Sequence, residues 1–197
     1  MFVSIFVLSN RVNAWSKYEI GKKVTYNGND YYVIENSDEE SDIVTMLKDE
    51  PLTYEEIIKL NLTNISVIEY NEYGVAKYGE SINYDSSYVK KILDSWKQFA
   101  VKDGGIVTLR LLTLDDLVNN LGYEYIEEGS SNYYFKTNET PKFVYTYNGV
   151  HYYWTMTPED DSSYIIVVRG DGGLNDSEYS SVGELIRPVI EIKKSAL

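Results

Sequence analysis

The sequence predicts an α+β fold with an antiparallel sheet and two to three helices. Strand-like runs come first, helical segments follow in the middle, and a second group of strand-like runs ends the chain. Strands and helices in separate groups are typical of α+β proteins, whereas a doubly wound parallel sheet alternates the two. The length of 197 residues suits one domain. No internal repeat or proline-rich linker divides the chain, so we expect a single domain over residues 15–197.

The first third of the chain predicts a hairpin and a third strand. Residues 24–26 and 31–34 are rich in β-forming residues, and residues 27–30, Asn-Gly-Asn-Asp, supply a turn between them. Residues 43–47 form the next expected strand. The segment 61–83 is punctuated by glycine, and we expect it to be mainly irregular.

Two helices carry clear start signals. Thr53 and Glu56 have the spacing of a capping box, so a short helix is expected to begin after Thr53. Residues 85–87, Asp-Ser-Ser, cap a longer helix whose apolar residues recur at helical spacing. We interpret this stripe as a core-facing surface, and its members are Val89, Ile92, Leu93, Trp96 and Phe99.

The second half of the chain alternates strand signals with turns. A strand is expected over residues 107–112, and Thr113 starts a short helix that Gly122 ends. Residues 129–141 are polar and predict a turn-like loop. The remaining expected strands are 143–147 and 150–155 around Asn148-Gly149, then 164–168, and finally 185–192, where Pro188 indicates an edge or bulged position.

Composition excludes several classes of function. The net charge of −13 and the pI near 4.5 argue against nucleic acid and against an anionic membrane surface as partners. The absence of cysteine excludes disulfides, thiolate metal sites and cysteine nucleophiles. His151 is the one histidine, and no motif supplies it with a nucleophile and an orienting carboxylate. The 20 tyrosines suit either a recognition surface or strand packing.

The first residues resemble the end of a signal peptide. Residues 1–9 are mostly apolar, and Val12 and Ala14 fit a signal-peptidase site before Trp15, although no basic residue precedes the run. We therefore interpret residues 1–14 as a signal-peptide remnant and expect a secreted or surface protein. The alternative is a buried first strand in a cytoplasmic protein. No apolar stretch is long enough for a transmembrane helix.

The last third carries a pattern that resembles a known group of proteins. Residues 153–157 (Tyr-Trp-Thr-Met-Thr), an aliphatic run at 165–168, Gly170, and residues 186–190 (Ile-Arg-Pro-Val-Ile) follow in this order. The pattern looks like a family of uncharacterised bacterial domains with a C-type-lectin-like fold, related to formylglycine-generating-enzyme-like and major-paralogous-domain proteins. Arg110-Leu111-Leu112, followed by Thr113 and an acid at Asp116, is similar to a further segment of that family.

The resemblance implies a C-type-lectin-like core over residues 85–194. Enzymes of this fold group use cysteines or a histidine-rich iron site, which this sequence cannot provide. The resemblance therefore implies a non-catalytic binding module for a glycan or protein ligand, with contacts in the loops 130–138, 158–163 and 170–182. The ligand-binding residues we predict are Tyr133, Tyr134, Asp171, Asn175, Asp176 and Tyr179.

Other functions stay open as alternatives. Paired acids could serve a carboxylate-based hydrolase, for which two carboxylates in one cleft would be the signature. A structural accessory domain of an envelope assembly would instead show an exposed apolar patch. Residues 171–176 are rich in oxygen ligands but lack EF-hand spacing, so we predict no cofactor and no metal, with calcium as the alternative. We expect Arg187 to be a buried arginine that ties strand ends to a carboxylate or to carbonyls.

Overall fold

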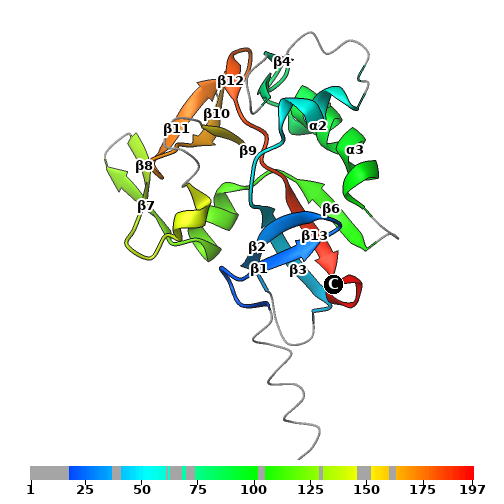
Figure 1. Ribbon diagram of the computed structural model, residues 1–197. Helices are drawn as coiled ribbons and strands as arrows, with labels where there is room; N and C mark the ends of the chain where they lie inside the picture. The colour runs from blue at the N-terminus through cyan, green and yellow to red at the C-terminus, as the bar shows by residue number, and fades with distance from the viewer. Residues whose placement is uncertain are drawn as a thin grey trace, which may run out of the picture.

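The main feature of the fold is a five-stranded antiparallel sheet with the order β1-β2-β3-β13-β6. The computed structural model describes residues 18–36, 41–60, 62, 68–69, 74–101, 105–128, 131–145, 152–159 and 163–197. The five strands are β1 (Lys23–Tyr26), β2 (Asn29–Glu35), β3 (Ile43–Lys48), β6 (Ile106–Arg110) and β13 (Val189–Lys193). The last strand of the chain therefore lies inside this sheet, between β3 and β6 (Figure 1).

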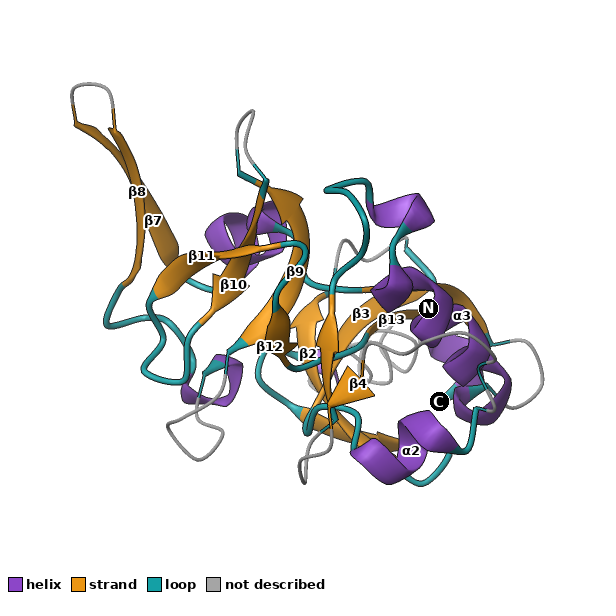
Figure 2. Cartoon of the chain, turned by 90° about the horizontal axis from the view of Figure 1, so that it is seen from above, coloured by secondary structure: helices purple, strands orange, loops and turns teal. Residues whose placement is uncertain are grey.

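Three smaller antiparallel units lie beside the main sheet. Two of them are three-stranded, with the orders β11-β10-β9 and β12-β5-β4, and the third is the hairpin of β7 and β8. Figure 2 shows this hairpin pointing away from the rest of the molecule. The strands are β4 (Ile68–Glu69), β5 (Val75–Lys77), β7 (Tyr123–Glu128), β8 (Ser131–Lys136), β9 (Tyr153–Pro158), β10 (Tyr164–Val168), β11 (Leu174–Glu178) and β12 (Val182–Glu184).

The helices complete an α+β fold of the predicted class. The described residues contain the α-helices α2 (Tyr54–Ile58) and α3 (Tyr88–Ala100) and a π-helix, η3 (Asp116–Asn120). The prediction of two to three helices with antiparallel sheets is confirmed at this level. The single-turn 3₁₀ segments are η2 (Tyr84–Ser86), η4 (Lys142–Val144) and η5 (Lys194–Ala196).

Local signals account for the starts of the helices and for the first hairpin. Thr53 accepts a hydrogen bond from the Glu56 N–H, and the Glu56 carboxylate accepts one from the Thr53 N–H, so the predicted capping box is present. Asn27 and Gly28 have φ angles of 47° and 78°, as the two-residue turn between β1 and β2 requires. Ser87 caps α3, as expected. Phe99, however, is 55% exposed, because Ala100 takes the buried place in the last turn.

The core joins the separate sheets through aromatic side chains. Trp154 of β9 is fully buried, and its indole N–H donates to the Ala76 carbonyl of β5 at 2.9 Å. The Tyr78 ring contacts the Trp154 ring edge-on, with centroids 5.3 Å apart. Helix α3 contributes Trp96 to the same apolar cluster, which also contains Ile190 of the central strand β13. The early, middle and late parts of the chain therefore share one core.

Three polar segments predicted to be irregular contain strands. Residues 61–83 include β4 and β5, residues 129–141 include β8, and residues 170–182 include β11. The polar composition of β11 misled the prediction. This strand lies at the edge of its sheet, and Asn175 and Asp176 are exposed there, so a polar sequence is compatible with pairing.

Two predictions for the late strands were wrong. The expected strand at 143–147 is the 3₁₀ segment η4 as far as Val144, and Asn148-Gly149 lies outside the described residues. Pro188 is neither on an edge strand nor in a bulge. It directly precedes the central strand β13, where its missing N–H is not needed and its carbonyl accepts a hydrogen bond from the Lys48 N–H at 2.8 Å. Residues 1–14 and His151 also lie outside the described residues.

Candidate functional site

Arg187 is part of the scaffold of the late segment, as predicted. It is 2% exposed and donates four hydrogen bonds to backbone carbonyls. The acceptors are the carbonyls of Lys48 at 2.8 Å, Asp49 at 2.9 Å, Phe143 at 2.8 Å and Val144 at 2.9 Å. The guanidinium therefore joins the end of β3 to the η4 turn, and these contacts use four of its five N–H donors.

A second arginine holds the π-helix against the main sheet. Arg110 on β6 forms a bidentate ion pair with Asp116, at 2.5 and 2.9 Å, and its Nε donates to Glu191 of β13 at 3.0 Å. Asp116 also accepts from the Thr113 N–H at 2.7 Å, and its own N–H donates to the Thr113 hydroxyl. The residues of the second resembling segment thus form a structural network that fixes the start of η3.

The predicted site residues Tyr133 and Tyr134 lie on strand β8, not in a loop. The register of the hairpin places Tyr134 opposite Tyr125 and Tyr133 opposite Ile126. Among the described elements, η3 contacts β7 and β11 contacts β8. Most of the ribbon extends away from the body, as Figure 2 shows.

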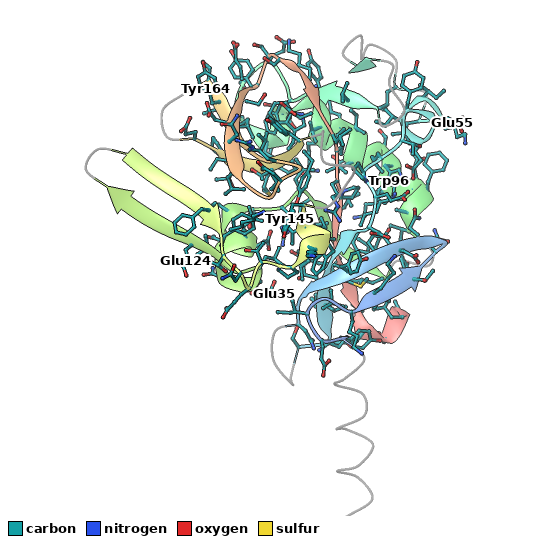
Figure 3. All side chains as sticks on the ribbon, turned by 60° about the vertical axis from the view of Figure 1, so that its left-hand side comes forward. Glu35, Glu55, Trp96, Glu124, Tyr145 and Tyr164 are labelled. Carbon is teal, nitrogen blue, oxygen red and sulfur yellow. The ribbon has the colours of Figure 1, made fainter. Side chains whose placement is uncertain are left out.

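The base of the hairpin meets the turn between β10 and β11, where Asp171 lies. The Lys136 ammonium at the end of β8 donates to the Asp171 carbonyl, and it lies 4.3 Å from the centroid of the Tyr145 ring. The Tyr123 hydroxyl of β7 donates to the Gly172 carbonyl at 2.9 Å. Figure 3 shows Tyr145 in this region of the molecule. We call this contact region the hairpin junction, formed by Tyr123, Lys136, Tyr145 and residues 171–172.

The Asp171 carboxylate is used within its own turn. One oxygen accepts from the Gly173 N–H at 2.9 Å, and the other accepts from Arg169 at 2.8 Å. These contacts lower the pKa of Asp171, mainly through the Gly173 N–H. The side chain is still 61% exposed, so its remaining lone pairs face solvent. Asp171 therefore stabilises its own turn without a ligand.

The other predicted residues follow along β11 and beyond it. Asn175 and Asp176 are exposed on this edge strand, opposite Val167 and Ile166 of β10. Tyr179 is half-buried against the main core, and its carbonyl accepts from the Gly79 N–H. Six residues of extended chain separate Tyr179 from the junction, a span of about 20 Å. The structure thus brings Asp171 close to the base of β8, whereas Tyr179 belongs to a different surface.

Sequence reasoning missed Lys136, Tyr145 and Tyr123 as parts of this region. Lys136 and Asp171 are 35 residues apart, and no local pattern connects them. The available signal was Gly172, which has a φ of 88° and leaves no room for a side chain. A Cβ atom there would lie 2.6 Å from Lys136 Cδ and 2.8 Å from Tyr145 Cγ. A glycine that permits such close contact marks a junction of chain segments.

One row of the main sheet brings two glutamates to the same face. The registers place Glu35 of β2 opposite Thr45 of β3, Thr45 opposite Glu191 of β13, and Glu191 opposite Thr108 of β6. Two strand spacings separate the Cα atoms of Glu35 and Glu191, which is about 10 Å. Both carboxylates have partners, because Thr45 donates to Glu35 at 3.2 Å and Arg110 donates to Glu191.

The described part of the chain carries neither a metal-binding cluster nor a membrane-spanning helix. Within it, no three His, Cys, Asp or Glu side chains come together in a group that could hold a metal ion. Its helices include none long and apolar enough to cross a bilayer.

The comparisons with known proteins concern the same late segment. Residues 109–194 match a family model described as a domain of unknown function (DUF6273). No curated protein and no solved structure matches the chain. The matched segment starts in β6 and ends just after β13, so it contains the hairpin junction and the Arg110 network. It also contains Arg187, although the Lys48 and Asp49 carbonyls that Arg187 binds lie outside it.

Proposed function

We propose that this protein is a binding module that recognises a glycan or protein ligand through the β7–β8 hairpin and the neighbouring strand β11. The observation that carries the proposal is the ribbon itself. Its register pairs Tyr134 with Tyr125 and Tyr133 with Ile126, and the described elements that contact it include η3 and β11. A two-stranded ribbon is marginally stable alone, so apolar residues in both of its strands favour burial against a partner.

The neighbouring polar groups suit recognition. Asn175 and Asp176 are exposed on β11, and Asp171 keeps exposed carboxylate lone pairs at the turn. Tyrosine next to small polar and acidic side chains is typical of recognition surfaces, because a rigid ring supplies area while polar groups supply directional bonds. The ligand-binding surface in this proposal therefore consists of the outer hairpin, the β10–β11 turn and the exposed face of β11.

A C-type-lectin-like fold and a place outside the cytoplasm belong to the same proposal. The fold is supported by the resembling motifs, since Tyr153-Trp154 lies on β9, residues 165–168 lie on β10, and Ile186-Arg187-Pro188 leads into β13. Export is supported by the sequence of residues 1–14. N-terminal sequencing of the protein made in a secreting bacterial host tests export, and a mature chain that starts at Met1 would contradict it.

Substitution in the hairpin tests the binding surface. The full chain would be screened on a glycan array and by pull-down from bacterial surface extracts, and the ligand found would then be titrated against variants. We expect Tyr133→Ser combined with Tyr134→Ser to weaken binding at least about tenfold, since aromatic residues dominate binding energies at interfaces. Phe99→Ser is the matched control, because it removes an exposed aromatic ring at the end of α3.

Equal affinities of the double variant and the native chain would contradict the hairpin assignment. A loss of binding in Phe99→Ser of the same size would also contradict it, because general surface hydrophobicity would then explain the result. Circular dichroism and melting temperature accompany each variant, so that unfolding is not mistaken for a lost contact.

A carboxylate-based hydrolase is the second candidate, and the row of Glu35 and Glu191 is the observation that favours it. Inverting glycosidases place their two carboxyl groups about 6.5–9.5 Å apart. The Cα atoms of Glu35 and Glu191 are separated by two strand spacings, about 10 Å, which is close to this range. Glu191→Gln should abolish any hydrolysis of a panel of chromogenic glycosides, whereas Glu124→Gln on the hairpin should leave it unchanged. Absence of activity in the native chain removes this candidate.

A structural accessory role is less well supported. Within the part of the chain that the structure describes, the exposed large apolar side chains lie on separate elements. They are Ile20, Ile58, Phe99, Val107, Phe135 and Tyr164.

A further inference from the structure

Two buried polar side chains lie next to each other on one face of the main sheet, beside the first turn of α2. The sheet register places Tyr31 of β2 directly opposite Lys48 of β3, and both residues are buried. Residues that are directly opposite in antiparallel strands share a face, with Cβ atoms about 4.5–5.5 Å apart. Glu56 of α2 completes the group, because its Oε1 lies 3.7 Å from Lys48 Nζ. We call Tyr31, Lys48 and Glu56 the α2 polar cluster.

Each member of this cluster has hydrogen-bonding capacity beyond its contacts with the chain. The Tyr31 hydroxyl is fully buried and has no hydrogen-bond partner among the residues that the structure describes. The Lys48 ammonium has three N–H donors, one of which donates to the Glu50 carbonyl at 3.1 Å. Glu56 Oε2 accepts from the Thr53 N–H at 2.7 Å, whereas Oε1 is too far from Lys48 Nζ for a direct hydrogen bond.

The electrostatics of the cluster place the Glu56 carboxylate near both of the other groups. Burial raises the pKa of Tyr31, and the charge of Glu56 adds to this increase. Burial lowers the pKa of Lys48, and Glu56 is the first of the groups that oppose this decrease. Polar groups that lie near each other but more than about 3.5 Å apart are commonly bridged by a water molecule.

We infer that an internal water molecule binds in the α2 polar cluster, where it accepts hydrogen bonds from the Tyr31 hydroxyl and the Lys48 ammonium and donates one to Glu56 Oε1. A buried water makes roughly three hydrogen bonds to polar groups that otherwise lack partners. The Glu56 side chain is 29% exposed, so solvent reaches the cluster on that side. The water fastens α2 to β2 and β3, because the same carboxylate caps the helix. This site is independent of the proposed binding function.

A crystal structure of the full chain, at a resolution that shows ordered waters, tests the site directly. We expect electron density for one water molecule within about 3.2 Å of Tyr31 Oη, Lys48 Nζ and Glu56 Oε1. A direct hydrogen bond from Tyr31 or Lys48 to Glu56 Oε1, with no water between them, would overturn the inference. A Tyr31 hydroxyl that contacts no water would overturn it as well.

A double-mutant cycle gives an independent test in solution. Tyr31→Phe removes the hydroxyl and keeps the ring, so we expect it to raise the equilibrium constant of unfolding about fivefold in urea titrations. In a Lys48→Met background, the same change should raise the constant less than about twofold, because the water has already lost one of its donors. The single variant and the crystal structure decide the inference even if Lys48→Met does not fold.

Tyr78→Phe is the matched control, because the Tyr78 hydroxyl is also buried and without a partner among the described residues. Burial and then Asp85 raise the pKa of Tyr78, and no described lysine contributes. We expect no increase in its unfolding constant. An unchanged or smaller constant for Tyr31→Phe would show that its hydroxyl has no water partner, and equal effects of Tyr31→Phe in the two backgrounds would show that no water links it to Lys48.

Discussion

Replacing Arg187 with Met should bring the fold close to its limit of stability. The side chain is 2% exposed, and its guanidinium donates to four backbone carbonyls from two segments. The guanidinium carbon also lies 5.4 Å from the centroid of the buried Tyr153 ring. Methionine fills part of the volume but donates nothing, so four carbonyls would lose a charged donor. Each buried polar group left without a partner costs about 1–3 kcal/mol.

Val144 O keeps the Tyr153 hydroxyl as a donor, so three carbonyls lose their side-chain donor. The expected loss is therefore about 3 kcal/mol or more, against a total stability of about 5–15 kcal/mol for a domain of this kind. Arg187→Lys should cost less, about 2–3 kcal/mol, because one ammonium keeps the charge but cannot reach carbonyls on both sides. Urea unfolding followed by tryptophan fluorescence measures these free energies. Arg169→Met is the control, since Arg169 is 39% exposed and forms one ion pair with Asp171. A loss below about 1 kcal/mol for Arg187→Met would refute the reasoning.

Three further predictions concern hydroxyl groups, a glycine and alkaline pH. Tyr153→Phe should lower the free energy of unfolding by about 1 kcal/mol in urea, because the hydroxyl donates to Val144 O at 2.7 Å. Tyr78→Phe should be neutral or stabilising, because that buried hydroxyl has no hydrogen-bond partner among the residues that the structure describes. Gly172→Ala should lower the free energy of unfolding more than Gly28→Ala in the same measurement. Both glycines have a positive φ, but a Cβ atom at Gly28 would meet nothing within 4 Å. Equal losses of stability would contradict the close packing at the junction. Burial raises the pKa of five tyrosines, to about 12 for Tyr153, so stability should be complete below the ordinary tyrosine pKa of about 10 and fall as pH rises above it. Phenolate absorbance should show these five groups ionising only as the chain unfolds, and ionisation in the folded state would contradict the prediction. The five are Tyr31, Tyr78, Tyr84, Tyr123 and Tyr153.

The elements that could be predicted are those whose signals are local. The Thr53 capping box, the Asn27-Gly28 turn and the Ser87 cap depend on residues within one turn of each other, and the structure contains all three. The buried role of Arg187 was also predictable, because this arginine stands between apolar residues and a proline that leads into an apolar strand. The carbonyls that it binds could not be predicted, since Lys48 is 139 residues away in the sequence.

The hairpin and its junction could not be predicted from the sequence, because the contacts that stabilise them join residues far apart in the sequence or depend on a partner strand. The residues at the two ends of β8 are polar. Its formation depends more on pairing with β7 than on its own composition. Lys136 gains its place from the Asp171 carbonyl and the Tyr145 ring, which belong to two other segments. Pro188 was misassigned for a related reason. Edge strands favour proline, but a position just before a central strand tolerates it equally well.

The interior place of β13, between β3 and β6, has a consequence for the order of events in folding. β3 finds its second neighbour only when the last residues of the chain arrive, and Arg187 can bind the Lys48 carbonyl only then. A ribosome or an export channel releases the chain from its N-terminus, so β1, β2 and β3 must wait with an open edge until nearly all of it has emerged. Such distant pairing predicts slow folding from the unfolded state. It also predicts that residues 109–194 made alone, without β1–β3 and α3, will not fold, because β13 would lose one of its two neighbours.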